Sequence, residues 1–262
     1  MIGELGSWGL LQARELFATY LVPYAALKGA WLERGRGGRL VVRSAASQVY
    51  YTAVEPLPVF LLIGVSLGFF VVVAADGLMR PNGLAPHVPT VVAQATVREL
   101  LPITIAVILT GRSGTAISTE LGYMRVNQEI EALEVAGVNV DYFLVLPRIV
   151  GLTLSSLGLT VCMGASALVG GFFVAQGLNL ASAGLRLTQI LGALTPATMG
   201  LALLKSVIFG LTIAAISCFH GMAVERHFAE IPRANVRGSV RSFFGCFLLN
   251  AVISVYAVSQ WR

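Results

Sequence analysis

The sequence predicts an all-α integral membrane protein with five transmembrane helices, and three observations support this fold class. First, 56% of the 262 residues are hydrophobic and only 12% are charged, whereas a soluble domain usually carries about 25% charged residues. Second, several apolar runs are long enough to cross a bilayer as helices. Third, lysine and arginine residues concentrate in alternate connecting segments, as the positive-inside rule describes.

Residues 1–55 precede the first predicted span and mix apolar with basic residues. Leu16, Phe17, Tyr20 and Leu21 recur at helical spacing. Basic residues are scattered among such apolar positions, namely Arg14, Lys28, Arg34, Arg36, Arg39 and Arg43. This pattern predicts interfacial amphipathic helices whose apolar face lies in the headgroup region and whose basic residues face phosphate.

Five transmembrane helices are predicted after this segment. They cover residues 57–75, 89–110, 149–175, 196–219 and 242–258. The second includes Arg98 and Glu99, and the fourth includes Lys205, whereas the first and third carry no charge. At about 1.5 Å per residue, each run is long enough to cross the hydrocarbon.

Small residues in the third predicted span indicate a close contact with another helix. Ser166 lies four residues before Gly170, and Ala167 lies four residues before Gly171. This spacing places small side chains on one face, where two backbones can approach closely. A shorter amphipathic helix is expected over residues 181–194, just before the fourth span.

The distribution of positive charge predicts the orientation in the membrane. With the N-terminus inside, thirteen of the 18 lysine and arginine residues lie in inner segments. Only Arg80, Arg186 and Arg262 lie in outer segments. The sequence therefore predicts a cytoplasmic N-terminus, an outward-facing C-terminus and a cytoplasmic segment between the second and third spans.

That cytoplasmic segment is predicted to form a helix over residues 115–137. At about 100° per residue, Glu120, Asn127, Glu131 and Glu134 fall on one side of this helix. Two apolar stripes flank the acidic side, which is more apolar surface than a connecting helix needs. We expect a docking helix for a soluble partner, ended by Gly137 in a left-handed conformation. The alternative is a solvated connector.

The three charges within the predicted spans allow two interpretations. A charge at mid-depth in the bilayer is costly, so such residues usually face a bundle interior or a wet cavity. Arg98, Glu99 and Lys205 could form a polar patch for an anionic amphiphile. They could also form a structural ion pair, with Glu99 between the two cations.

A protease is a further alternative. Gly111 to Gly114 match the GxSG pattern of intramembrane serine proteases, with Ser113 as nucleophile and His220 as base. Both residues fall at the ends of predicted spans, and no oxyanion hole is evident, so this interpretation is weak. The sequence contains no P-loop, Rossmann glycine pattern or metal-ligand cluster. ATP, if it is used, must bind another chain.

The central part of the chain strongly resembles the MlaE-type permeases of ABC lipid transporters that work with MCE proteins. The resemblance rests on Arg98-Glu99-Leu100, on GRSGTAISTELGYMRV, on EIEALEVAGV and on the closing Leu-Pro-Arg. It continues through LLKSVIFGLTIAAISCFHG at residues 203–221.

The resemblance implies a homodimeric permease in the bacterial inner membrane, with a cytoplasmic N-terminus and a periplasmic C-terminus. Two copies of an ABC ATPase would bind ATP and Mg and receive the coupling helices, and a hexameric MCE-domain protein would lie on the outer face. Membrane lipids, phospholipids above all, would be the cargo, and the role would be to maintain outer-membrane or envelope lipid asymmetry. We expect no catalytic residue, metal, cofactor or nucleic-acid partner for this chain. An ATP-independent flippase or channel is the remaining alternative.

Two groups of residues follow from this interpretation. The expected substrate path contains Arg98, Glu99 and Lys205. The residues expected to couple the chain to the ATPase are Glu120, Gly122, Arg125, Glu131, Glu134 and Gly137.

Overall fold

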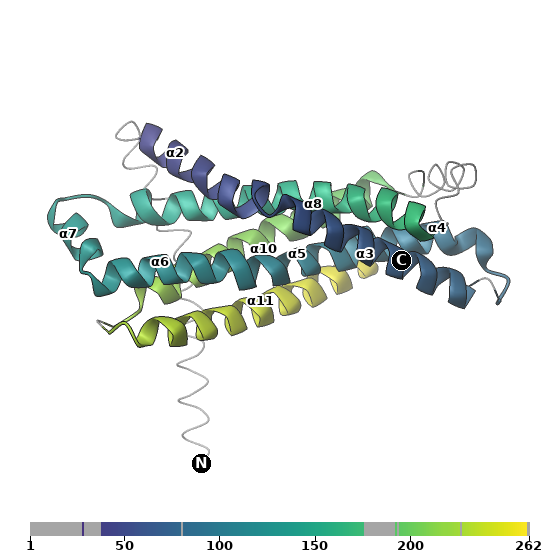
Figure 1. Cartoon of the computed structure of the whole chain (residues 1–262). Coiled ribbons are helices and arrows are strands. Elements are labelled where there is room, and N and C mark those ends of the chain that lie inside the picture. Colours follow the sequence, from purple (N-terminus) through teal and green to yellow (C-terminus); the bar gives the residue numbers. More distant parts are fainter. Residues whose placement is uncertain are drawn as a thin grey trace, which may run out of the picture. The chain divides into compact units, whose positions relative to one another are not determined.

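The computed structural model describes residue 28 and residues 38–79, 81–175, 192, 194–225 and 227–260, and Figure 1 shows its course. The described residues form helices and short connections, with no strand among them. The interfacial helices expected before residue 38 and nearly all of the amphipathic helix expected over 181–194 lie outside these residues, as does Arg262.

Five helical stretches of the described chain are long and apolar enough to cross a membrane. They are Leu57–Met79, Val88–Val126, Asp141–Val174, Pro196–Met222 and Glu230–Ala257. The fold class predicted from the sequence is therefore confirmed. The part of the chain that the structure describes is helical, and its five candidate spans are those of a multi-pass membrane protein.

The helices have the following bounds. The α-helices are α2 (Gly38–Val49), α3 (Leu57–Met79), α4 (Val88–Ala93), α5 (Leu101–Leu109), α6 (Thr115–Val126), α7 (Glu129–Val135), α8 (Leu146–Ala175), α10 (Pro196–Met222) and α11 (Glu230–Gln260). A 3₁₀-helix, η2, covers Ala85–His87, and four π-helical segments are η1 (Tyr50–Val54), η3 (Gln94–Leu100), η4 (Thr110–Gly114) and η5 (Asp141–Val145).

Two of these helices extend beyond the apolar runs in the sequence. The second span continues without a break through η4 into α6, because Gly111 and Gly114 are accommodated in a π-helical turn. Similarly, α11 begins at Glu230, well before the predicted residue 242. Its early turns carry arginines, which a helix tolerates wherever water or headgroups can reach them.

The described chain forms two compact units. The first consists of the described parts of Met1–Val49, Leu109–Thr153 and Gly210–Cys246. The second consists of the described parts of Tyr50–Ile108, Leu154–Phe209 and Phe247–Arg262. The helices α8, α10 and α11 each contribute residues to both units.

In the second unit, α3 and α8 meet backbone to backbone (Figure 1). A Cβ atom on Gly68 would overlap the backbone of Ala167, and one on Gly171 would overlap the backbone of Gly68. A Cβ atom on Gly64 would overlap Ser166, and Gly170 faces Val65. The close helix contact predicted from the small-residue spacing is confirmed, and α3 is the partner of α8.

In the first unit, α6 packs against α10 and the beginning of α11. Gly221 of α10 lies against Leu121 and Ser118 of α6, so closely that a Cβ atom there would clash. Gly122 lies against Ile231 of α11. Ile117 and Leu121 are almost completely buried as a result. Small residues at helix crossings thus set α6 in a fixed position.

The α3–α8 contact generates a stability prediction. Gly68→Ala should destabilise the protein by about 1–3 kcal/mol, the usual cost of overpacking, because the added methyl meets backbone that cannot turn away. Gly77→Ala on the same helix is the matched control, since a Cβ atom there meets nothing within 4 Å. Thermal unfolding in detergent measures both variants. Equal melting temperatures would contradict the close contact.

Candidate functional site

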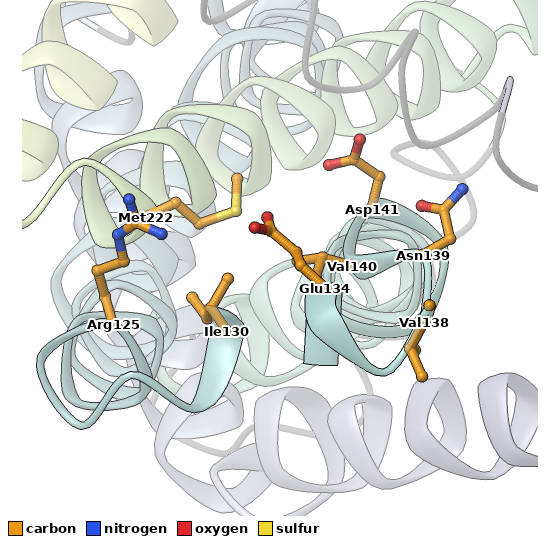
Figure 2. A pocket seen from close by; sticks show the side chains of 9 residues that line it. Arg125, Ile130, Glu134, Val138, Asn139, Val140, Asp141 and Met222 are labelled. Atoms are coloured by element: carbon orange, nitrogen blue, oxygen red, sulfur yellow. The ribbon is translucent and has the colours of Figure 1, made fainter. Parts of the chain in front are cut away.

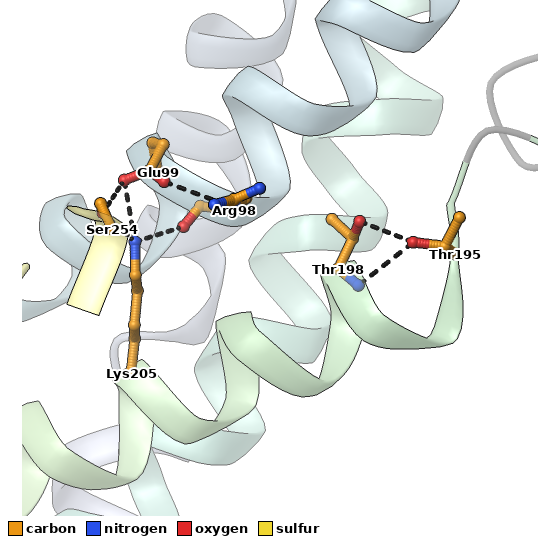
Figure 3. A network of polar contacts seen from close by, with 6 residues as sticks. All are labelled: Arg98, Glu99, Thr195, Thr198, Lys205 and Ser254. Carbon is orange, nitrogen blue, oxygen red and sulfur yellow. Dashed lines mark hydrogen bonds and ion pairs between the residues drawn. The ribbon is translucent and has the colours of Figure 1, made fainter. Parts of the chain in front are cut away.

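The charged residues of the spans come together in the second unit, in a network of Arg98, Glu99, Lys205 and Ser254 (Figure 3). Arg98 and Glu99 lie on η3, Lys205 on α10 and Ser254 on α11. A π-helical turn shifts the register of an α-helix by one residue, and such turns are frequent at functional sites. Here the turn places two adjacent charged residues beside α10.

Lys205 is the centre of this network. Its side chain has no exposed surface. Its ammonium Nζ lies 2.8 Å from Glu99 Oε2, 2.8 Å from Ser254 Oγ and 3.1 Å from the Arg98 carbonyl oxygen. An ammonium group has three N–H donors, so these three acceptors use its full capacity. Lys205 of α10 is therefore joined by hydrogen bonds to both η3 and α11.

Glu99 connects the lysine to the other polar groups. Its Oε2 also accepts a hydrogen bond from Ser254 Oγ at 2.7 Å. Its Oε1 lies 3.3 Å from Arg98 Nε. The carboxylate thus forms ion pairs with two cations and a hydrogen bond with one hydroxyl. The Glu99 side chain is 36% exposed. The geometry is that of the ion-pair interpretation, with Glu99 between Arg98 and Lys205.

Arg98 differs from Lys205 in having unused donors. Its side chain is 14% exposed. Nη2 and Nε are buried without a hydrogen-bond acceptor among the described residues, and Nε has only the ion-pair contact with Glu99. A buried guanidinium group with free N–H donors is suited to an additional anion.

Ser254 was missed by sequence reasoning. A single serine in an apolar run carries no periodic signal, and only the fold brings it to Lys205. Its hydroxyl accepts a hydrogen bond from the Lys205 ammonium and donates one to the Glu99 carboxylate. Both charged groups therefore gain a hydrogen-bond partner from this serine.

The segment expected to form one coupling helix over 115–137 is in fact two helices, α6 and α7. Gln128 adopts a left-handed conformation with φ of 60° and ψ of 21°, and the helix breaks there. Asn127 and Gln128 are polar and exposed, so no burial of their side chains holds the helix straight. Beyond the break, Ile130 is again buried. The prediction of a single helix was wrong at this point.

The predicted acidic face is also divided by the break. Glu120 is paired with Arg148 at 3.0 Å. Glu131 is paired with Arg125 at 3.1 Å, across the break between α6 and α7. Glu134 is exposed on α7 without such a partner among the described residues. Two of the three expected contact carboxylates are therefore neutralised within the chain.

Helix α7 ends as predicted, with Gly137 in a left-handed conformation. Gly137 has φ of 75°. The Gly137 N–H donates to the Glu134 carbonyl, and the Val138 N–H donates to the Leu133 carbonyl. These two bonds form a Schellman motif, which ends a helix with a left-handed residue. Gly122, another expected coupling residue, is buried and lies against Ile231 of α11.

A hollow lies between the break and this helix end. It is lined by Arg125, Ile130, Glu134, Gly137, Val138, Asn139, Val140, Asp141 and Met222 (Figure 2). We call it the α7 hollow. All of these residues belong to the first unit.

The protease alternative gains no support from the surroundings of His220. Its Nε2 lies 3.1 Å from Nη1 of Arg241. A guanidinium group only donates, so this ring nitrogen acts as an acceptor toward Arg241. The lone pair that would take a proton from Ser113 is occupied.

Comparison with known proteins gives concordant results. A family model described as Permease MlaE matches residues 45–256. The protein TRIGALACTOSYLDIACYLGLYCEROL 1 of Arabidopsis thaliana is 28% identical over 84% of this chain and 63% of its own length. The probable ABC transporter permease protein slr1045 of Synechocystis is 27% identical, over 83% of this chain and 82% of its own. A probable ABC transporter permease protein of Rickettsia bellii is 26% identical over 64% of each chain. The match thus spans less than two thirds of the plant and Rickettsia relatives.

The Lys205 network leads to a double-mutant test. Lys205→Met or Glu99→Gln alone should destabilise the protein, toward the lower end of about 3–5 kcal/mol, because each leaves a charge without its main partner. The double variant should be destabilised by less than the sum of the two single variants, because each single variant already lacks the same Lys205–Glu99 contact. Thermal unfolding in detergent provides the comparison.

Ser254→Ala is the milder control, since it removes only one hydroxyl from the same network. If Lys205→Met leaves the melting temperature unchanged and only reduces bound lipid, Lys205 is a ligand residue and the structural role is wrong.

Proposed function

The chain belongs to the MlaE permease family, and we propose that it is the membrane-spanning subunit of an ABC-type lipid transporter. The observation that carries this proposal is the family match over residues 45–256. This range includes all five candidate spans apart from Ala257, the last residue of the fifth. The relatives in Synechocystis and Rickettsia are named as probable ABC transporter permeases. The plant relative is named after trigalactosyldiacylglycerol, a glycolipid, which supports a lipid as cargo.

In this proposal the energy comes from a separate ATPase. The sequence carries no P-loop, so nucleotide and Mg would bind that partner. Two copies of this chain would pair with two ATPase subunits, and α7 would be the part that touches them. An MCE-domain protein on the opposite face of the membrane would exchange lipid with the permease.

The lipid headgroup would meet Arg98. Its Nη2 is buried and without an acceptor among the described residues, and phosphate takes paired N–H donors from arginine. Glu99 and Lys205 would act indirectly, by holding η3 in the conformation that presents Arg98. The cargo would then be an anionic or zwitterionic phospholipid.

The distribution of charge supports the proposed orientation in the membrane. A bacterial inner membrane, with the N-terminus in the cytoplasm and the C-terminus in the periplasm, places most arginines and lysines inside. ATP binding would close the ATPase dimer, move α7 and shift the population of permease conformations. Such a machine would maintain the lipid asymmetry of the envelope.

The central test is transport in proteoliposomes. The permease reconstituted with its ATPase and MCE-domain protein should move labelled phospholipid when ATP is present, and a hydrolysis-dead ATPase should stop this movement. Arg98→Gln should reduce transfer and phospholipid co-purification severalfold, because the guanidinium donors to the headgroup are lost. The ATPase should stay bound, because α7 is unchanged in this variant. Transfer that continues with the dead ATPase would favour an ATP-independent flippase or channel instead.

Topology can be tested with single cysteines. The background is a variant in which Cys162, Cys218 and Cys246 are replaced, because Cys162 is exposed and would react as well. Asn82→Cys should be labelled by an impermeant maleimide in cells whose outer membrane alone is permeabilised. Glu129→Cys should be labelled only after the inner membrane is opened too. Both residues are exposed, so access is governed by the membrane. Labelling of Glu129→Cys with the inner membrane intact would reverse the proposed orientation.

A further inference from the structure

His220 lies near the C-terminal end of α10 and contacts Arg241 of α11, within the first unit. Only 6% of His220 is exposed. Its Nε2 lies 3.1 Å from Arg241 Nη1. A guanidinium group has N–H donors and no acceptor, so Nε2 must offer the lone pair of an uncharged imidazole ring. The contact therefore exists only while Nε2 carries no proton.

The surroundings of the imidazole ring are closely packed. A Cβ atom on Gly238 of α11 would lie 3.4 Å from His220 Cβ and Cδ2. The Phe219 ring meets the imidazole edge to face, with the ring centroids 5.4 Å apart. On the next residue of α10, a Cβ atom on Gly221 would lie 2.8 Å from Leu121 Cβ of α6. A reorientation of the ring would therefore meet neighbouring atoms rather than open space.

The charge that α11 places beside the ring is positive. Arg241 makes the contact itself, and Arg237, one helical turn earlier, is exposed and has the same sign. Glu230 lies eleven residues before Arg241, which is about 16 Å along a helix. Its Oε2 accepts a hydrogen bond from the Glu225 N–H, at the beginning of α11. This carboxylate is therefore used far from the ring.

Helix α6 meets the same part of α10 through Ser118 and Leu121, which do not titrate. The carboxylate on this part of α6 is Glu120, and it pairs with Arg148 at 3.0 Å. On α10 itself, Cys218 has no exposed surface, and burial favours an uncharged thiol. The acidic group of this region thus already has its own counter-charge.

We infer that the His220–Arg241 contact is a pH-sensitive connection between α10 and α11, formed at neutral pH and released by acid. A proton on Nε2 replaces the acceptor with a second donor and places two cations at hydrogen-bond distance. Arg241 is half-buried and has a long stem, so its guanidinium group can turn away while the buried ring stays. In the unfolded chain, a histidine takes up a proton below about pH 6.5 without this loss. The folded state therefore loses stability as the pH falls.

Other contacts of α11 do not depend on pH in this range, so the effect is local. Asn235 Nδ2 donates a hydrogen bond to Thr119 Oγ1 of α6 at 2.6 Å. A buried apolar cluster lies at the beginning of the same helix, formed by Val224, Ile231 and Ala234. Acid should loosen α11 around residues 238–242 and leave its beginning in place.

The contact lies on the side of the membrane that the charge distribution predicts to be cytoplasmic. A connection that acid releases would let this permease respond to acidification of the cytoplasm. The direction of the response rests on the proposed orientation. The contact and its release by acid depend neither on a partner nor on the transported lipid.

The test is hydrogen–deuterium exchange of residues 238–242 in the purified full chain in detergent, at about pH 7.5 and about pH 5.5. The exchange rate of the wild type is divided by that of His220→Gln at the same pH, so that the intrinsic effect of pH on exchange cancels. The glutamine oxygen can accept from Arg241 and takes up no proton. The ratio should be near one at neutral pH and severalfold higher in acid. The wild type should also lose several degrees more of its melting temperature than His220→Gln between these pH values.

Two further variants serve as controls. His227→Gln is the matched control, because His227 is exposed in the connection before α11, and this variant should behave like the wild type. Arg241→Gln keeps an N–H donor but removes the positive charge, so its response to acid should be smaller than that of the wild type.

Each outcome decides the inference. A full response to acid in His220→Gln would overturn it, and so would a response that disappears in His227→Gln. A response of full size in Arg241→Gln would assign the effect to the buried ring alone and would overturn the connection. If His220→Gln does not fold, His220→Asn replaces it. A failure of lipid transport would contradict the proposed function and leave these measurements unaffected.

Discussion

The ammonium group of Lys205 sets the main constraint on the second unit. A charge without water must find all its hydrogen-bond partners in the protein, and Lys205 finds one on each of three residues from two other spans. The Arg98 carbonyl can accept this bond because the residue four positions on, Pro102, has no N–H to donate to it. The buried lysine therefore takes one of its three acceptors from the backbone of η3.

Other charged residues of the chain also form ion pairs within the protein. Arg148 is buried and holds Glu120, while Arg125 holds Glu131 across a helix break. Both pairs keep carboxylates in place within the first unit. Both carboxylates therefore have a counter-charge in the same chain. An acidic residue in a predicted helix indicates a contact with a partner protein only when no arginine or lysine of its own chain pairs with it.

Much of the fold could be predicted from the sequence, because hydropathy and helix-end chemistry are local. The five spans follow from apolar runs, the α8 contact face from Ala167 and Gly171, and the end of α7 from Gly137. Features that depend on distant residues could not be predicted. One such feature is the break at Gln128, after which Ile130 is buried in contacts that only the fold supplies. Another is the hydrogen bond between Lys205 and Ser254, two residues that lie far apart in the sequence.

The segment from α6 to α7 combines a closely packed helix with a break in the helical backbone. Gly221 brings α10 against α6 without room for a methyl group, and Gly122 lets α6 pack tightly against Ile231 of α11. Between α6 and α7, the backbone turns at Gln128, where a left-handed non-glycine residue costs about 1 kcal/mol or more. The Arg125–Glu131 pair spans this same point. Residues six positions apart do not face each other on a continuous helix, so this ion pair can form only where the helix breaks. The pair therefore favours the broken arrangement and offsets part of the cost of the left-handed residue.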